Sequence, residues 1–291
     1  MIYSPLRYPG GKGKITPLIQ LLIEQQNNIN TYIEPFAGGA GVAIELLENN
    51  IVERIVINDF DKRIASFWKA VLENPERFVY QIMNVPLTMD EWNRQRDICW
   101  NQANGYSFEL GFATFYMNRT NRSGIIKGGV IGGKEQAGNW RLDARFNREK
   151  LARRVERIAE RKKDICVYSQ EIGTFLKRYI SKYEENAFVY FDPPYFDKGK
   201  QLYMNYFQFD DHVRIKDAIK EKVKSSWVIT YDDSADILKI YDGYSVRKFD
   251  LNYSAANVRR ASELIIFKNR ELIPSKEELA ANGININLRA I

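Results

Sequence analysis

The residues best suited to chemistry lie in the stretch 186–196, NAFVYFDPPYF. Its apolar, β-favouring part, 188–191, predicts a strand buried on both faces, as in a parallel sheet. The two prolines after Asp192 cannot continue the ladder, because they have no N–H, so the chain leaves the sheet there. Open α/β sheets bind ligands at this end of a strand. Asp192, the free carbonyls of the turn and the ring of Tyr195 are therefore candidate ligand contacts, against the alternative of a plain strand-ending turn.

A second candidate site is the stretch 31–47, TYIEPFAGGAGVAIELL, which predicts a strand, a glycine-rich turn and a helix. The dinucleotide-binding pattern fails, because Ile44 stands where its third glycine should be. Glu34 would also repel a pyrophosphate, so a cationic ligand such as an α-amino group or a sulfonium fits better. The strand at 54–59 ends in Asp59, in the usual place of an acid that binds an adenosine ribose, and Phe60 can lie against an adenine ring.

Residues 7–14, RYPGGKGK, form a loop before an amphipathic helix that begins near Ile15. A glycine-rich loop with a lysine before a helix raises the alternative of a P-loop ATPase. That pattern requires a glycine five residues before Gly13, and Tyr8 stands there.

The alternation of strands and helices stops between about residue 65 and residue 164. Helices are predicted at 67–84, 88–104 and 108–116, and Asn147 is expected to cap a basic helix that runs to 163. Between them, 124–138 is rich in glycine with apolar pairs, which predicts a flexible β-hairpin. Asparagine, arginine and lysine side chains in this stretch are the types that bond base edges and phosphates. The chain therefore divides into 1–66 with 164–291 and an inserted domain, 67–163.

Composition limits the class of protein further. The chain has 291 residues with 45% hydrophobic content, no run long enough for a membrane helix and no signal-peptide pattern. Cys99 and Cys166 stand alone in the sequence, and His212 is the only histidine. We therefore expect neither a metal site nor catalysis that depends on histidine. Two isolated cysteines also predict that the protein is located in a reducing cytoplasm. A net charge of +6 is compatible with a polyanionic partner.

Together these segments resemble the Dam-type, or α-class, DNA adenine-N6 methyltransferases. Four motifs in order support the resemblance: YPGGK at 8–12, EPFAGGAG at 34–41, NR followed by glycine at 118–124, and DPPY at 192–195. It implies an α/β fold: a Rossmann-like, mostly parallel seven-stranded sheet with one antiparallel edge strand, for which 262–268 is suited. The inserted domain would be mainly helical, with a β-hairpin, and would recognise DNA.

The resemblance also implies roles for individual residues. The cofactor S-adenosylmethionine would contact Tyr8, Lys12, Glu34, Pro35, Phe36, Gly38, Gly39, Gly41, Asp59, Phe60, Glu171 and Asp192. Catalysis would fall to Asp192, Pro193, Pro194 and Tyr195, and DNA binding to Arg7, Asn118, Arg119, Asn121, Arg122, Lys127, Arg141, Asn147 and Arg153. Two positions depart from the pattern: Glu171 is longer than the usual Asp, and Lys127 replaces a base-reading Arg and lacks its planar fork.

The predicted reaction is site-specific methyl transfer to N6 of a flipped-out adenine in double-stranded DNA. A cytosine-N4 enzyme and a catalytically inactive DNA-binding relative are the alternatives; the first usually has Ser in place of Asp192, and an RNA or protein amide methyltransferase more often has Asn. A cytosine-C5 enzyme is excluded, because neither cysteine follows a proline. The recognition sequence, a cognate restriction endonuclease and the oligomeric state are left open.

Overall fold

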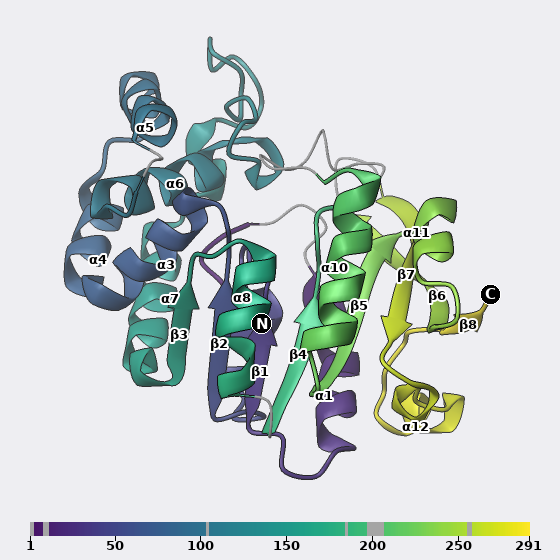
Figure 1. Cartoon of the computed structure of the whole chain (residues 1–291). Coiled ribbons are helices and arrows are strands. Elements are labelled where there is room, and N and C mark those ends of the chain that lie inside the picture. Colours follow the sequence, from purple (N-terminus) through teal and green to yellow (C-terminus); the bar gives the residue numbers. More distant parts are fainter. Residues whose placement is uncertain (1–2, 8–11, 103–104, 184–185, 197–206, 255–257) are drawn as a thin grey trace.

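The centre of the molecule is an eight-stranded sheet in the order β3-β2-β1-β4-β5-β7-β6-β8 (Figure 1). The computed structural model describes residues 3–7, 12–102, 105–183, 186–196, 207–254 and 258–291, with the backbone alone for 251–261. The strands are β1 (Thr31–Glu34), β2 (Arg54–Asn58), β3 (Ile165–Tyr168), β4 (Ala187–Phe191), β5 (Ser226–Asp232), β6 (Ser245–Ser254), β7 (Val258–Phe267) and β8 (Arg289–Ala290).

The five strands β3, β2, β1, β4 and β5 run parallel, and their register aligns their carboxyl ends. Ile33 of β1 pairs with Val56 on one side and with Val189 on the other. The order in which successive strands join the sheet reverses between β1 and β4, so the connections after these two parallel strands lead to opposite faces. Ligands of open α/β sheets bind at such a switch point.

Helices cover both faces of the sheet, because alternate side chains of each strand point to opposite sides. Tyr32 packs against one helical layer and Ile33 against the other. The first layer contains α1 (Thr16–Glu24), α2 (Gly41–Glu48), α3 (Lys62–Glu73), α4 (Pro75–Asn84), α5 (Met89–Asn101), α6 (Phe108–Thr120) and α7 (Arg148–Glu160). The second contains α8 (Ile172–Arg178), α10 (Phe209–Lys222) and α11 (Ala235–Ile240), while α12 (Lys276–Ala281) lies beside the sheet end (Figure 1).

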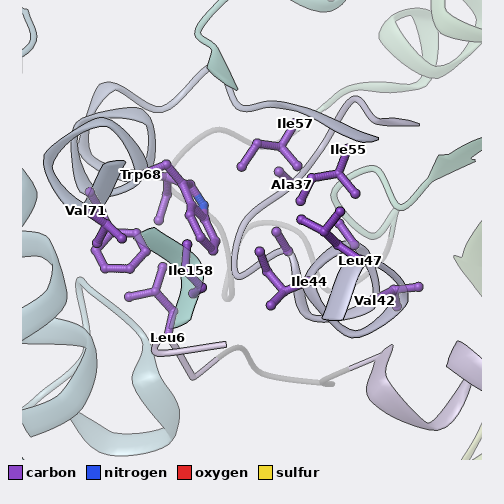
Figure 2. Packing of buried hydrophobic residues seen from close by; sticks show 14 of the residues in the cluster. Leu6, Ala37, Val42, Ile44, Leu47, Ile55, Ile57, Trp68, Val71 and Ile158 are labelled. Carbon is purple, nitrogen blue, oxygen red and sulfur yellow. The ribbon is translucent and has the colours of Figure 1, made fainter. Parts of the chain in front are cut away.

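The inserted helices share one hydrophobic core with the sheet. Figure 2 shows Trp68 of α3 facing Ala37 and Ile44 beside the glycine loop, and Ile158 of α7 near Leu6. Helix α6 approaches α3 closely because position 111 is glycine: a Cβ there would lie 2.4 Å from the Ser66 carbonyl oxygen. The insertion therefore packs onto the same face of the sheet as α1 and α2.

The predicted helices are present, with one division. The stretch expected as a single helix at 67–84 forms α3 and α4, because Asn74 precedes Pro75, and the residue before a proline is disfavoured in the helical region. Pro75 instead starts α4, where its missing N–H costs nothing. Asn147 caps α7 as predicted: its side chain accepts the Lys150 backbone N–H at 3.0 Å.

The fold class is confirmed, and two details of it differ. The sheet has eight strands and not seven, because the tail adds the two-residue strand β8, which pairs with Arg247 and Lys248 of β6. The antiparallel strand β7, which contains 262–267, lies inside the sheet and not at its edge, because β6 pairs along its other side. Helix α8 ends at Arg178, before a 3₁₀ turn, Ile180–Lys182.

The predicted β-hairpin at 124–138 is wrong. One isolated antiparallel bridge joins Asn121 and Val130, and the rest of the segment is turns. The Asn121 side-chain amide donates to the carbonyls of Ile125 and Ile126, which removes acceptors that a ladder would need. Gly132 and Gly133 have positive φ values of 87° and 77°, which a strand does not allow.

Among the described residues, no helix combines the length and the apolar character needed to cross a membrane.

Candidate functional site

A cavity of about 1120 Å³ opens at the carboxyl ends of β1, β2 and β4. It brings together every predicted cofactor residue except Tyr8, which lies outside the described residues. The lining includes Lys12, Glu34, Pro35, Phe36, Gly38, Gly39, Gly41, Asp59, Phe60, Glu171 and Asp192. Segments more than 150 residues apart in the sequence therefore meet in one pocket.

The glycine loop after β1 is held in a fixed shape. The Gly38 N–H donates to Oδ2 of Asp59 at 2.9 Å, and the Gly38 carbonyl accepts from Trp68 Nε1 at 3.0 Å. Ala40, in the left-handed region with φ 44°, turns the chain into α2. A Cβ at Gly41 would meet nothing within 4 Å, so the protein itself does not require glycine there and a ligand can approach the backbone closely.

Glu34 is a buried carboxylate at the base of this loop. Its Oε1 accepts hydrogen bonds from the Tyr32 hydroxyl at 3.0 Å and from the Ala43 N–H at 3.1 Å. Burial raises its pKa to about 8, although these two hydrogen bonds lower it. Ionising the Glu34 carboxyl is costly because it is buried. A cationic ligand beside it would stabilise the charged carboxylate, so this site favours a cation.

Asp59, Phe60 and Glu171 lie around the other end of the cavity. Asp59 accepts from the backbone N–H groups of Gly38 and Asp61, and burial with the neighbouring Asp61 raises its pKa to about 7. The Phe60 ring is 54% exposed and free to stack. Both oxygens of Glu171 cap α8, accepting from the Gly173 and Thr174 N–H groups at 2.9 and 3.0 Å.

The carboxylate of Asp192 is positioned by a buried network. Its Oδ1 lies 3.2 Å from Lys12 Nζ and accepts a hydrogen bond from the Thr230 hydroxyl at 2.9 Å. Lys12 also pairs with Oε2 of Glu263 at 2.7 Å. Within the described part of the chain, Oδ2 of Asp192 accepts from no other group, and Asp192 lines the cavity.

Glu263 and Thr230 were missed by the sequence reasoning. Both lie on strands of the sheet half that follows DPPY, and the pairing of β7 with β5 brings them beside Lys12. Burial disfavours the charged form of Lys12, but Asp192, Tyr190 and Glu263 outweigh it and raise the Lys12 pKa well above its ordinary value. No motif spacing connects Lys12 with Glu263; a charged residue directly before the apolar run LIIF was the available signal.

Tyr195 is buried, with 5% of its surface exposed. Its hydroxyl donates to Oε1 of Glu263 at 2.8 Å, and Lys12 Nζ lies 5.2 Å from its ring centroid. The chain after it is fixed by the Phe196 N–H, which donates to Asp232. The segment 197–206 lies outside the described residues. Stacking of Tyr195 on a base stays a prediction that requires its ring to be uncovered.

Asn118 and Asn121, predicted to contact DNA, are fully buried and used inside the protein. Asn118 accepts from the Arg7 N–H at 2.7 Å and donates to the Arg7 and Gly124 carbonyls. Asn121 accepts from Trp92 Nε1. The prediction of direct DNA contact is therefore wrong for both side chains, because their polar atoms already have partners away from solvent. The motif NR followed by glycine holds the segment 3–7 against α6.

Arg7 and Arg119 line the same cavity as Asp192, together with Arg145 and Arg154. We call these four residues the arginine cluster. Arg119 is buried, with 9% exposed, and donates to the Arg145 and Pro5 carbonyls. Arg145 and Arg154 were not singled out from the sequence, because arginines on a basic helix and its preceding turn are usually solvated.

The remaining predicted DNA-binding residues lie on the surface of the insertion. Lys127 borders a smaller pocket of about 440 Å³ beside Trp92 and Trp100. Arg153 is 73% exposed on α7, with Glu149 at 3.7 Å. The other exposed members of the set are Arg122, Arg141 and Asn147.

The chain matches the family model of D12 class N6 adenine-specific DNA methyltransferases over residues 8–255. It is 25% identical over 265 residues to the type II methyltransferase M.MjaIII of Methanocaldococcus jannaschii, covering 84% of this chain and 89% of that protein. It is 24% identical over 260 residues to the type II methyltransferase M1.LlaDCHI of Lactococcus lactis subsp. cremoris, covering 84% and 86%.

Among solved structures, a SAM-dependent methyltransferase from Agrobacterium tumefaciens aligns with a TM-score of 0.41 and 11% identity, over 87% of this chain and 60% of that one, which adds nothing to the family assignment. The family match covers all of the glycine loop, the insertion and the DPPY turn. It identifies an enzyme that transfers methyl from S-adenosylmethionine to adenine N6 in DNA, and it removes the cytosine-N4 alternative. The chain belongs to the D12 class N6 adenine-specific DNA methyltransferases.

Proposed function

We propose that the cavity at the carboxyl ends of β1, β2 and β4 holds both S-adenosylmethionine and the target adenine. The residues present fit the cofactor: Glu34 favours a cation, Asp59 retains lone pairs for a ribose, and Phe60 offers an exposed ring. Bound there, S-adenosylmethionine supplies a methyl group on a positively charged sulfur. The cofactor contacts are those of Lys12, Glu34, Pro35, Phe36, Gly38, Gly39, Gly41, Asp59, Phe60 and Asp192, with Glu171 near the adenine end.

Asp192 acts on the adenine amino group. The N6 lone pair is delocalised into the ring, so the nitrogen is a poor nucleophile. The carboxylate of Asp192 and the carbonyl of Pro193 accept hydrogen bonds from the amino group and favour a tetrahedral nitrogen. Positive charge that develops on N6 is then stabilised by Asp192 inside a water-poor pocket. The proton leaves to water, so the chain requires no histidine.

The observation that carries this proposal is that, among the described residues, Oδ2 of Asp192 has no hydrogen-bond partner. Its other oxygen, Oδ1, is held by Lys12 and Thr230, so the carboxylate of this cavity-lining residue is fixed in position. Such positioning before the substrate arrives reduces the reorganisation needed in the transition state.

The target adenine reaches this site by flipping out of the duplex, since its amino group cannot meet the cofactor inside the base stack. Pro194 lines the cavity, and Tyr195, once uncovered, would stack on the extruded ring, which offsets ~1–3 kcal/mol of unstacking.

The insertion 67–163 is the target-recognition domain, and 1–66 with 164–291 form the catalytic domain. The exposed basic residues of the insertion contact DNA; they are Arg122, Lys127, Arg141 and Arg153. Among them, Lys127 reads a base and Arg153 binds a phosphate. Arg7 and Arg119 act from inside the cavity.

Because relatives are named type II methyltransferases, a cognate restriction endonuclease is a further proposed partner. The free state of Cys99 and Cys166 supports a reducing cytoplasm as its location.

Chromatography of nucleosides from DNA treated with the protein and S-adenosylmethionine tests the reaction. N6-methyladenine should be the product in double-stranded DNA, and mapping the modified bases gives the recognition sequence. Methyl found on cytosine alone would refute the adenine-specific site.

A further inference from the structure

The arginine cluster concentrates positive charge on one wall of the catalytic cavity. Arg7 comes from the segment 3–7, Arg119 from the end of α6, Arg145 from the 3₁₀ turn Leu142–Arg145, and Arg154 from α7. These parts of the chain are distant in sequence, and the fold assembles them beside the residues that line the cofactor pocket.

Backbone carbonyls, which carry no net charge, hold two of these side chains in place. Arg119 Nε donates to the Arg145 carbonyl at 2.9 Å, and Arg154 Nη1 donates to the Ser4 carbonyl at 3.2 Å. Ser4 in turn donates to the Gly39 carbonyl at 2.5 Å. Arg154 is therefore connected to the glycine loop through Ser4. These contacts do not neutralise the charges of the cluster.

No ion pair between described residues includes a member of the cluster. Arg157 and Arg161, on and just after α7, differ: they pair with Glu48 and Asp164. Nη1 of Arg7 is buried and has no hydrogen-bond partner among the residues that the structure describes. Burial lowers the pKa of Arg119 to about 9, with Arg7, Arg154 and Arg145 adding repulsion. Arg145 is exposed, whereas the side chains of Arg7, Arg119 and Arg154 are at least partly buried. Partly buried cations without a paired anion are stabilised when an anion binds.

Two oxyanions could reach this wall: the carboxylate of the cofactor and the phosphodiesters of the DNA. One carboxylate cannot balance four guanidinium groups. Three of the four arginines also belong to the insertion, which is proposed to recognise DNA. The planar fork of arginine matches two phosphate oxygens at once.

We infer that the arginine cluster binds the phosphodiesters that flank the flipped adenine, so that the cavity takes up the nucleotide together with its backbone. This inference rests on the proposed site for adenine at Asp192. It places a DNA-binding surface inside the catalytic cavity, in addition to the exposed basic residues of the insertion.

The test uses Arg145→Ala, because the Arg145 side chain makes no hydrogen bond or ion pair with any described residue, and its removal leaves the fold supported. The probes are duplexes that contain the mapped site, either unmodified or with a neutral methylphosphonate at the linkage next to the target adenine. Arg145→Ala should weaken binding of the unmodified duplex about tenfold and reduce the salt slope by about 0.9. Arg214→Ala, on the opposite face of the sheet in α10, is the matched control and should bind normally.

The inference is decided by whether the affinity losses caused by the protein variant and by the neutral linkage depend on each other. Arg145→Ala and the methylphosphonate together should cost little more than either alone, because they remove the same contact. Additive losses, or an unchanged affinity of Arg145→Ala for DNA, would overturn the inference. A tenfold loss of S-adenosylmethionine binding with DNA binding intact, measured by calorimetry, would also overturn the inference. That outcome would assign the arginine cluster to the carboxylate of the cofactor.

A second variant, Arg154→Lys, retains the positive charge but lacks the planar fork of the guanidinium group. It should lose part of the coupling between the protein and the phosphate linkage. Full retention of the wild-type coupling counts against the inference. These binding measurements are independent of turnover. If the coupling is present while Asp192 variants methylate normally, the proposed role of Asp192 fails and the phosphate site stands.

Discussion

Lys12 lies between two carboxylates, Asp192 and Glu263, and all three are at least three-quarters buried. Breaking one member of such a network leaves a neighbour without its partner, which costs more than the pair contributes when intact. Both contacts that the Asp192 carboxylate makes with described residues of this network fall on Oδ1, and Asp192 lines the cavity. The members of the network are thus best probed by substitutions that keep their shape.

Asp192→Asn should lower the single-turnover rate about 10²–10³-fold, because the amide cannot stabilise positive charge on N6. Cofactor and DNA affinities should change little, since the side-chain volume is retained. Rapid-quench measurement of methyl transfer, with equilibrium binding in parallel, checks this. A near-normal single-turnover rate would show that Asp192 does not act on the transition state.

Glu263→Gln should reduce turnover about 10- to 100-fold through misplacement of Lys12 and Tyr195. It should also move the basic limb of the pH–rate profile to lower pH, because the Glu263 charge helps to raise the pKa of Lys12. The exposed Glu271→Gln is the control. If the rate falls while the basic limb stays in place, Glu263 acts only in packing.

At the scale of elements, the segment 3–7 links the glycine loop to the insertion. Ser4 contacts the loop at Gly39, and Asn118 of α6 holds both backbone groups of Arg7. Gly124 closes this contact, since a Cβ there would lie 2.5 Å from the Arg7 carbonyl oxygen. The glycine loop and the helices of the insertion are therefore joined through residues 3–7.

Gly124→Ala should destabilise the protein by about 1–3 kcal/mol, because alanine is strained at φ 77° and its methyl group displaces Arg7. Urea unfolding measures the loss. Gly129→Ala, in the same loop with nothing within 4 Å of its Cβ, should be close to neutral. Equal stabilities for the two variants would contradict the role given to Gly124.

Lys127→Ala and Arg153→Ala should fail differently, since they belong to different elements of the insertion. Loss of a base contact at Lys127 should cost ~1–3 kcal/mol on the cognate site and flatten discrimination at one base pair. Loss of a phosphate contact at Arg153 should weaken cognate and random DNA alike and reduce the salt slope by about 1. Binding to cognate and single-mismatch duplexes over a salt series separates them; the reverse pattern would place the reading surface on α7.

For the whole molecule, the buried acids at the strand ends make stability depend on pH. The pKa of Glu34 is about 8 when folded, against 4.5 as its ordinary value. Between these values the folded state holds a proton that the unfolded state has lost. The free energy of unfolding should therefore fall as pH rises from about 5 to 8, with Asp59 adding to the decline up to about 7.

Glu34→Gln should flatten this decline in cofactor-free protein, and the exposed Glu53→Gln should not. Urea midpoints at several pH values between 5.5 and 8.5 give the slope. An unchanged slope in Glu34→Gln would mean that Glu34 is already ionised at pH 6 in the folded protein.

The sequence by itself determined the parts whose physics is local. Strand 188–191, its proline stop, the glycine loop, the Asn147 cap and the acid after β2 follow from residue types within short windows. That Glu34, Asp59 and Asp192 share a pocket was implied by the family resemblance, and the cavity contains all three residues.

Tertiary structure alone decided the contacts between distant segments. Glu263 meets Lys12 through the register of β7 on β5, and the arginine cluster forms where α6, α7 and the segment 3–7 converge. The burial of Asn118 and Asn121 was hidden for the same reason: an asparagine that bonds a base and one that bonds a carbonyl look alike in sequence. Only the fold shows which partner each polar atom has, because hydrogen bonds of side chains depend on neighbours that the chain brings together from afar.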